Sequence, residues 1–425
     1  MNIRDSSNFV RYNPKSDRFK INGFHHIELW CSDATNTSCR FSHSLGIPLV
    51  AKSDLSTGNF IHASYLLRGG NLNFLFTAAY PPNLSTTKPS SSSSDVIPSF
   101  DYGTHLSFTT AHGLAVRAVA LDVDDADVAF HASITAGAIP VAEPVLLEGQ
   151  VTIAEVQLYG DVVLRYVSHA NAHNNDCFLP KFSPVNKDDY FNEFGIVALD
   201  HIASCVPELA LVSNSDYIKM ITGFHDFIEY DAEDMLEITD TIKTVFVANN
   251  NESVVLNLFE PVEGTTTQRN NFAHTFLNHN NGPGVQHLAL QTKDIFKTLK
   301  EMKKRSGLGG FNFTPSPPSE YYKGMREWAG DVLTEEQILE CEKLSIKVDR
   351  DHEGVLLQIF TTPIGDRPTL IIEIIQRIGC MIEGEDEKMY QKPACGGFGK
   401  GNINRLIKSI EDYEKTLICD GTIPS

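Results

Sequence analysis

Three ionisable side chains stand alone inside apolar stretches in the second half of the sequence. Glu373 is at the centre of the run Thr-Leu-Ile-Ile-Glu-Ile-Ile-Gln-Arg, and His201 and His287 lie in runs of similar character. Short apolar runs of this kind are typical of buried β-strands. An ionised carboxylate in such a strand is costly unless a cation or several donors meet it. One interpretation is that Glu373 forms an ion pair and both histidines are ordinary core residues; the other is that all three bind one metal ion.

The second interpretation has a definite chemistry. Two imidazoles and one carboxylate form the facial triad that holds non-haem Fe(II) and leaves coordination positions open for a substrate and O₂. It requires the fold to bring His201, His287 and Glu373 together, although they are far apart in the sequence. The elements that position these residues therefore decide between the two interpretations.

Four similar modules are recognisable along the chain, each opening with a strand and a helix and closing with further strands. Their opening strands lie near residues 24–30, 114–121, 197–203 and 285–290. An internal repeat indicates the architecture, and paired units of this kind curl into a half-open barrel around a cavity. We therefore predict an α+β protein of two domains, each made of paired βαβββ modules that form a half-open barrel. The predicted domains span residues 20–170 and 194–418.

The two halves of the chain differ at the positions of the three candidate metal ligands. Aligning their modules sets each candidate ligand opposite a counterpart: His201 opposite His26, His287 opposite Ala118, and Glu373 opposite roughly Arg165. The N-terminal half therefore cannot build the same site. If the repeat is real, the C-terminal half places all three ligands on strands that face one barrel interior, and we predict the metal site there.

A glycine-rich stretch, Gly396 to Asn402, follows the strand of Glu373. Apolar residues then recur at helical spacing from Ile403 to Leu417. We predict a C-terminal helix that closes over the cavity as a lid. An ordinary packed helix is the alternative.

Composition excludes several classes of partner. The chain has 425 residues and a formal charge of −19, which repels nucleic-acid backbones and anionic lipid. No apolar run approaches the roughly 20 residues of a membrane helix, and the polar N-terminus does not resemble a secretory signal. The eight cysteines include no Cys-x-x-Cys pair and are expected to be free thiols in a reducing compartment. We predict a cytoplasmic protein with no nucleic-acid or membrane partner.

Several long motifs resemble the plant 4-hydroxyphenylpyruvate dioxygenase family of the vicinal-oxygen-chelate superfamily. They lie at residues 13–19, 51–59, 356–377 and 396–402, and the resemblance runs over nearly the whole chain. It implies Fe(II) bound by His201, His287 and Glu373, the residues singled out above. It also implies that an α-keto acid and O₂ are the small-molecule partners, that an arylpyruvate is converted to homogentisate and CO₂, and that the protein is a homodimer.

The same resemblance implies the roles of four further residues. Gln286 and Gln358 match the glutamines of the family's pocket. Phe360 and Phe398 match its aromatic clamp, with Phe398 at the gate before the closing helix.

The substrate pocket departs from the family pattern. The family's usual Ser, Pro, Asn, Gln and Phe are here Thr244, Asn257, Phe259, Phe272 and Ile403, respectively. Phe259 and Phe272 each replace an amide with an apolar ring, which removes hydrogen bonds to a polar substrate. Asn257 is two residues from Phe259 on the same predicted strand, so it shares a face with Phe259 and could restore one polar group.

These departures leave several functions open. The leading one is the ordinary 4-hydroxyphenylpyruvate reaction, and a divergent paralogue that acts on phenylpyruvate or a branched aliphatic α-keto acid is the main alternative. A mandelate product, formed by attack on the benzylic carbon, is a third. An extradiol catechol dioxygenase shares barrel and triad but lacks the extension from Gly396, and a non-catalytic binding protein is the last.

Overall fold

The computed structural model describes most of the chain. The described residues are 12–82, 97, 99–170, 178–186, 191–228, 242–262, 272–351, 354–383, 389–399 and 402. The predicted lid helix, including Ile403, lies outside them.

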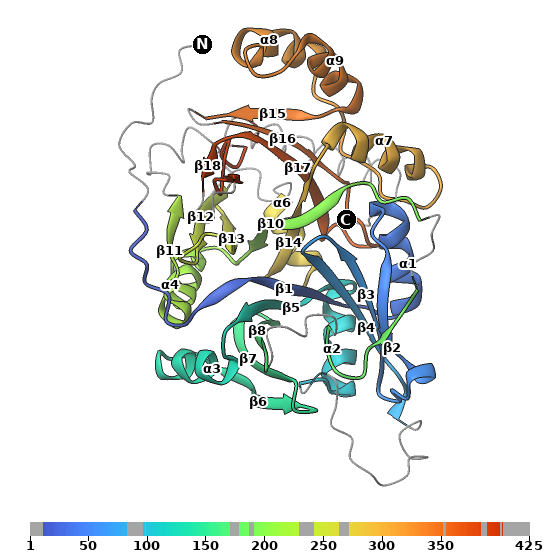
Figure 1. The fold of residues 1–425 in the computed structure, drawn as a ribbon, viewed down its shortest axis with the longest axis vertical. Helices are drawn as coiled ribbons and strands as arrows, with labels where there is room; N and C mark the ends of the chain where they lie inside the picture. The colour runs from blue at the N-terminus through green and yellow to red at the C-terminus, as the bar shows by residue number, and fades with distance from the viewer. Residues whose placement is uncertain are drawn as a thin grey trace.

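The first half of the described chain forms one mixed sheet with the strand order β6-β7-β8-β5-β1-β4-β3-β2-β9. Its strands are β1 (Ile21–Trp30), β2 (Leu49–Ser53), β3 (His62–Gly69), β4 (Leu72–Ala79), β5 (Ala115–Val123), β6 (Pro140–Leu147), β7 (Val151–Tyr159), β8 (Val162–His169) and β9 (Ser183–Pro184). The helices of this half are α1 (Ala34–Leu45), the short 3₁₀ helix η1 (Leu55–Thr57), α2 (Tyr102–His112) and α3 (Ala126–Thr135). In Figure 1 this half occupies the lower part of the molecule, with β1 and β5 running across the middle.

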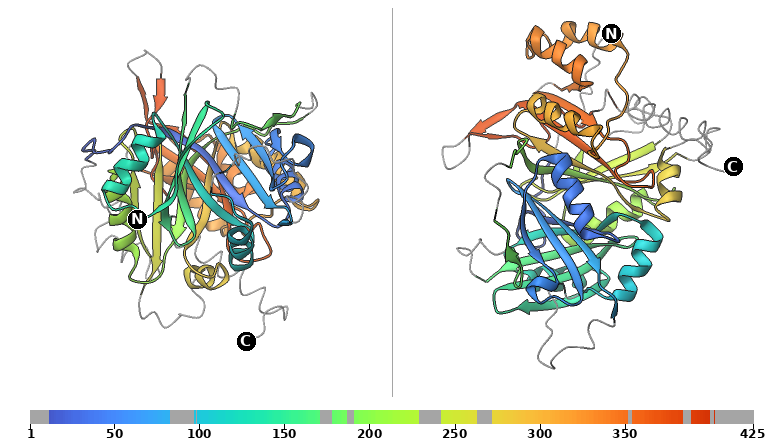
Figure 2. Two further views of the ribbon diagram at one scale, coloured as in Figure 1. Left: turned by 90° about the horizontal axis from the view of Figure 1, so that it is seen from below. Right: turned by 90° about the vertical axis from the view of Figure 1, so that its right-hand side faces the viewer.

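The second half forms another mixed sheet with the order β11-β12-β13-β10-β14-β17-β16-β15. Its strands are β10 (Ile196–Cys205), β11 (His225–Ile228), β12 (Ile242–Ala248), β13 (Val255–Pro261), β14 (Gly284–Thr292), β15 (Lys347–Arg350), β16 (Gly354–Phe360) and β17 (Ile371–Gly379). Its helices are α4 (Leu211–Thr222), α6 (Phe272–His279), α7 (Ile295–Ser306), α8 (Ser319–Ala329) and α9 (Glu335–Leu344), and a small hairpin of β18 (Met381–Glu383) and β19 (Met389–Gln391) follows. Helices α8 and α9 lie beyond the edge strand β15 (Figures 1 and 2).

The predicted repeat is confirmed by the strand pairing. In each sheet the opening strands of the two modules are antiparallel neighbours, β1 with β5 and β10 with β14. Each opening strand also pairs in parallel with the last strand of its own module: β1 with β4, β5 with β8, β10 with β13 and β14 with β17. The fold is therefore α+β, built of paired βαβββ modules as expected.

One apolar core runs between the two halves. Phe41 on α1 packs edge-on against Phe311 of the second half, with ring centroids 5.1 Å apart. Buried residues of β1, β5, β10 and β14 belong to the same cluster. The two sheets are thus held together by the burial of a continuous apolar surface.

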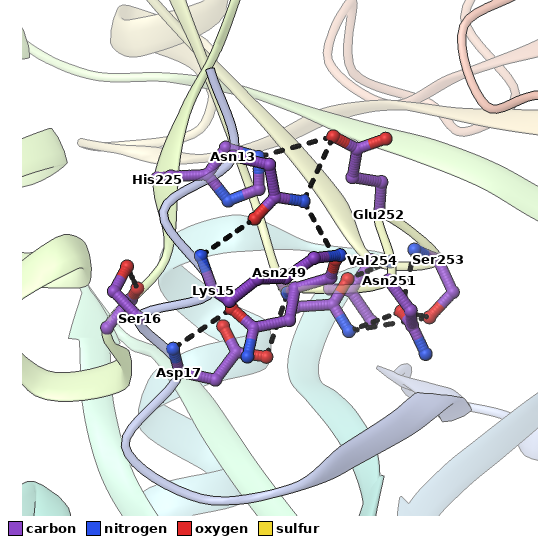
Figure 3. A network of polar contacts seen from close by, with 12 residues as sticks. Asn13, Lys15, Ser16, Asp17, His225, Asn249, Asn251, Glu252, Ser253 and Val254 are labelled. Carbon is purple, nitrogen blue, oxygen red and sulfur yellow. Dashed lines mark hydrogen bonds and ion pairs between the residues drawn. The ribbon is translucent and has the colours of Figure 1, made fainter.

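Residues 13–17, shortly before β1, are bound to the second half by polar contacts. The Asp17 carboxylate accepts a hydrogen bond from the Asn250 amide N–H at 2.8 Å, and the Asp17 amide donates to Asn250 Oδ1 at 3.1 Å. Asn13 Nδ2 donates to the Asn250 carbonyl at 2.8 Å and to Glu252 Oε1 at 3.3 Å (Figure 3). This network joins the start of the chain to the turn between β12 and β13.

The expectation of eight free thiols is wrong for one pair. Cys380 and Cys395 form a disulfide, with Cα atoms 5.7 Å apart. The chain reverses through the hairpin of β18 and β19 between them, so residues 15 apart in sequence become neighbours. No Cys-x-x-Cys spacing signals such a contact, and the argument from free thiols to a reducing compartment does not hold for this pair.

Within the described ranges, none of the helices is both long enough and apolar enough to cross a bilayer.

Candidate metal centre

Three neighbouring strands bring the predicted ligands to one face of the second sheet. Across β10, β14 and β17 one row of paired residues contains His201, Ala289 and Glu373. His287 lies two residues before Ala289 on β14, so its side chain points to the same face as theirs. The small Ala289 between the two outer ligands leaves room for an ion above the middle strand.

A bulge precedes each histidine. Between the pairs Leu199 with Leu290 and His201 with Ala289, β10 has one extra residue, Asp200. The residue before His287 on β14 is likewise extra in the pairing with β10. A bulge re-aims the side chain of the extra residue, which explains how the residue before each histidine can reach its ring.

The three ligand side chains converge. Glu373 Oε2 lies 3.4 Å from His201 Nε2 and 3.6 Å from His287 Nε2. One ligand atom from each of the three residues can be chosen so that all lie within 4.8 Å of one another. Among the described residues, no other cluster of His, Cys, Asp and Glu meets that criterion.

The hydrogen bonds of the two histidines prepare them to bind a cation. His201 Nδ1 lies 2.8 Å from the Asp200 carboxylate, and His287 Nδ1 lies 2.6 Å from Gln286 Oε1. Because both partners are acceptors, each Nδ1 carries the proton and each Nε2 presents a lone pair. Those lone pairs face the carboxylate of Glu373, and acceptors that face one another require a proton or a metal ion between them.

Burial sets the charge of the metal-free site. It raises the pKa of Glu373 to about 7, and although His201 counteracts this shift, desolvation dominates. It also holds the pKa of His287 well below its usual value, with a further contribution from His201. In the absence of a metal the site thus favours a protonated carboxyl and a neutral imidazole. A divalent cation can replace that proton, so the residues present fit a metal of the facial-triad type.

Comparisons with known proteins decide the family. The chain is 57% identical over 413 residues to 4-hydroxyphenylpyruvate dioxygenase from Plectranthus scutellarioides, covering 96% of this chain and 92% of that protein. It is 54% identical over 413 residues to the protein of the same name from Arabidopsis thaliana, covering 97% of this chain and 92% of that protein. The chain belongs to the 4-hydroxyphenylpyruvate dioxygenase family. A scan against protein-family models matched none of them.

A solved structure supports the fold of this 4-hydroxyphenylpyruvate dioxygenase family member. A variant of 4-hydroxymandelate synthase from Streptomyces coelicolor matches it with a TM-score of 0.69 and 23% sequence identity. The match covers 94% of this chain and 99% of that chain. At this level of identity the likeness concerns the fold.

A buried ion pair supports the first histidine. Arg377 donates from Nε and Nη2 to the two oxygens of Asp200, both at 2.8 Å. Although burial opposes it, this guanidinium holds the pKa of Asp200 far below its usual value. Arg377 Nη1 also donates to the carbonyls of Cys395 and Gly397, at 2.7 and 2.6 Å. The glycine-rich loop is therefore tied to the residue that orients His201.

Both predicted aromatic residues contact the histidines. The Phe398 ring packs edge-on against His201 with centroids 5.1 Å apart, and also contacts Phe246 at 4.5 Å. The Phe360 ring packs edge-on against His287 at 5.7 Å. Phe360 is also paired with Glu373 across β16 and β17, so it faces the same side of the sheet.

The other residues predicted to line the pocket fall into two groups. Phe259 and Phe272 are both buried, with ring centroids 5.6 Å apart, and form an apolar wall. The Thr244 hydroxyl donates to Asn257 Oδ1 at 2.6 Å. Phe272 also lines a pocket together with Gln286. The polar group expected at Asn257 is present, but its oxygen is already occupied by Thr244.

The first sheet carries a different set of side chains at the positions equivalent to the candidate ligands. Its equivalent row contains His26, Ala120 and Arg165. The Arg165 guanidinium bonds the carboxylates of Glu28 and Glu155 at 2.7 and 2.6 Å and donates to His26 Nε2 at 2.9 Å. The alignment of Arg165 with Glu373 is thus confirmed, and a buried guanidinium takes the place of the ion.

Two residues with a clear part in the site, and a third buried residue on the same sheet, were missed in the sequence. Asp200 and Arg377 flank predicted ligands along the chain, and charged residues inside the same apolar runs were the signal that could have revealed them. Lys347 was hidden in the short edge strand β15. Its side chain is 1% exposed, and its register partner is Gln358.

Proposed function

We propose that this protein is an Fe(II)-dependent dioxygenase that oxidatively decarboxylates an α-keto acid, as in the conversion of 4-hydroxyphenylpyruvate to homogentisate and CO₂. The observation that carries the proposal is the convergence of His201, His287 and Glu373 in a chain that is more than half identical to proteins of that name. The extradiol alternative has no comparable support, because the relative from Plectranthus scutellarioides carries the name 4-hydroxyphenylpyruvate dioxygenase and matches over 96% of this chain.

Different residues would hold the iron, orient its ligands and line the site. His201, His287 and Glu373 would hold the iron, which when bound supplies the redox chemistry and open positions for the keto acid and O₂. Asp200 and Gln286 fix the orientation of the two imidazoles through their Nδ1 atoms. Further residues line the site: Gln358, Phe360 and Phe398 would exclude water and contact the substrate.

A second substrate class is favoured by one specific observation. The adjacent rings of Phe259 and Phe272, with centroids 5.6 Å apart, form an apolar wall without hydrogen-bonding groups. A substrate hydroxyl left unpaired against such a wall loses roughly 1–3 kcal/mol. A more apolar α-keto acid, phenylpyruvate or a branched aliphatic one, therefore remains the alternative substrate, and a mandelate remains the alternative product.

The test is product analysis with iron-loaded protein. We expect O₂ uptake with at least one of 4-hydroxyphenylpyruvate, phenylpyruvate and a branched aliphatic 2-oxo acid, with homogentisate formed from the first. The variants His201→Ala and His287→Ala should lose both iron and O₂ uptake while remaining folded. Absence of O₂ uptake with every keto acid would leave only the binding-protein alternative.

A variant of the apolar wall separates the two substrate classes. Phe259→Asn restores an amide, so we expect the ratio of kcat/KM for 4-hydroxyphenylpyruvate over phenylpyruvate to rise about tenfold or more. Phe130→Leu, at a buried ring on α3 of the first half, is the control and should not change this ratio. An unchanged ratio in Phe259→Asn would show that the wall does not set the preference.

The proposal extends to the organisation of the protein. The metal would belong to a catalytic domain of residues 194–418, and residues 20–170 would form a domain without metal. The protein would be a homodimer and would be located in the cytoplasm. Light scattering on the purified protein measures the oligomeric state.

A further inference from the structure

Lys347 is a buried cation that the proposed function does not use. It is 1% exposed, and its Nζ makes no hydrogen bond within the described part of the chain. A lysine on an edge strand ordinarily faces solvent, where it prevents strand addition. This one points inward, and a buried ammonium whose N–H groups meet no acceptor is expensive.

The register of the sheet aims this side chain at the metal centre. Lys347 is paired with Gln358 across β15 and β16, and Phe360, two residues further along β16, is paired with Glu373. Residues paired across strands or two apart along one strand share a face. Lys347 therefore lies on the same inner face as Glu373, and its Nζ is 6.0 Å from the centre of the Phe360 ring.

The strand that carries Lys347 is held firmly. Its neighbour Val348 accepts from the Tyr321 hydroxyl at 2.8 Å and donates its amide to the same oxygen at 2.7 Å. Asn402 Nδ2 also donates to the Val348 carbonyl, at 3.0 Å. The ammonium is thus presented by a fixed backbone, as a binding group requires.

We propose that Lys347 is a specificity-determining residue whose ammonium binds an anionic oxygen of the substrate, an inference that rests on the proposed function. An α-keto acid brings such an oxygen into the site, and the charge-assisted hydrogen bond would satisfy the buried donor. The oxygen belongs either to the keto-acid carboxylate or to an acidic group at the far end of the substrate. In contrast to the apolar rings of Phe259 and Phe272, Lys347 then provides a charged group on the face of the sheet that carries Glu373.

The charge state agrees with this role. Burial lowers the pKa of Lys347 to about 8, although Glu373 opposes the shift. The side chain is therefore still mostly an ammonium at pH 7.

The experiment compares Lys347→Met, which removes the charge at similar volume, with Lys347→Arg, which keeps it. For iron-loaded protein we expect Lys347→Met to raise KM, and the calorimetric Kd of the anaerobic keto-acid complex, about ten- to a hundredfold. Lys347→Arg should stay within about threefold of the wild type. The control is Lys303→Met on α7, which removes a partly buried ammonium that lies over the Phe313 ring. It should change neither KM nor Kd.

Stability without substrate provides a second readout. Because Lys347→Met removes an unpaired buried charge, the substrate-free variant should unfold at a higher temperature than the wild type. Weaker binding combined with higher stability is the signature of a group retained for function. A lower unfolding temperature with an unchanged Kd would overturn the inference and make Lys347 a structural residue.

The substrate panel separates the two sources of the oxygen. Weaker binding of every keto acid assigns the carboxylate, and weaker binding only of a keto acid with a second acidic group assigns the far end. If the wild type binds keto acids in a Lys347-dependent manner but consumes no O₂, the proposed function fails and the inference stands. If it consumes O₂ and Lys347→Met leaves Kd unchanged, the inference alone fails.

Discussion

At the scale of single residues, burial decides the charge of the metal-binding groups. The carboxyl of Glu373 is 3% exposed and has its pKa raised from the ordinary 4.5 to about 7. His287 is kept neutral, which is the form that binds a metal. The neutral imidazole of His287 and a carboxyl ready to lose its proton make a site whose affinity for a cation increases as the pH rises through 7.

The same shift predicts a pH-dependent stability. Between pH 4.5 and 7 the folded metal-free protein holds a proton on Glu373 that the unfolded chain has lost, so stability falls as the pH rises across this range. Glu373→Gln removes this effect. We expect it to raise the free energy of unfolding at pH 8 more than at pH 5, measured by urea denaturation without metal.

The control for this prediction is Glu143→Gln, which changes an exposed glutamate. Its effect on the free energy of unfolding should be small at both pH values. An equal effect of Glu373→Gln at pH 5 and pH 8 would contradict the raised pKa.

At the scale of the elements, one backbone arrangement serves two purposes. In both sheets the opening strand of one module pairs with that of the next, and a bulge precedes the residue that enters the centre. In the second sheet the centre holds metal ligands, and in the first it holds Arg165 between two glutamates. The shared geometry places the side chains, and the identity of three residues decides the chemistry.

The cluster of Arg165 yields a stability prediction. Arg165→Met leaves the buried carboxylates of Glu28 and Glu155 without their cation, so the free energy of unfolding should fall by roughly 3–5 kcal/mol. Arg350→Met disrupts the surface ion pair with Asp331 and should cost less than about 1 kcal/mol. Denaturant titration of the two variants measures the difference. Equal losses of unfolding free energy in the two variants would show that the buried cluster stabilises the protein no more than the surface ion pair does.

At the scale of the whole molecule, the two halves form one packed unit. They share an apolar core, and the segment before β1 reaches across to the turn between β12 and β13. Since that segment precedes the first sheet but binds the second, it ties the halves together through polar contacts as well.

This polar connection can be tested with Asp17→Ala. The substitution removes an acceptor of the Asn250 amide and should lower the free energy of unfolding by about 1–2 kcal/mol. Asp127→Ala, at an exposed contact with His131 on α3, is the control and should have an effect below about 0.5 kcal/mol. Both are measured by thermal and urea unfolding. A loss in Asp127→Ala as large as in Asp17→Ala would mean that the contact contributes nothing specific.

Much of this protein was determined by local features of the sequence. Apolar runs identified the opening strands of the four modules, and the repeat of these modules predicted the paired architecture that the register confirms. The isolated Glu373, His201 and His287 were recognisable because ionisable groups in apolar strands need a compensating partner. The counterpart Arg165 followed from the same repeat.

Only the tertiary structure decided the contacts between distant segments. The bulges that turn Asp200 and Gln286 toward the histidines depend on how two strands pair, and the disulfide of Cys380 depends on a chain reversal. Lys347 lies on the same face of the sheet as Glu373 because the edge strand β15 pairs with β16, and it is buried there. Burial and register are properties of the assembled sheet. The sequence alone therefore does not show whether a charged side chain in a short strand points to the interior or to solvent.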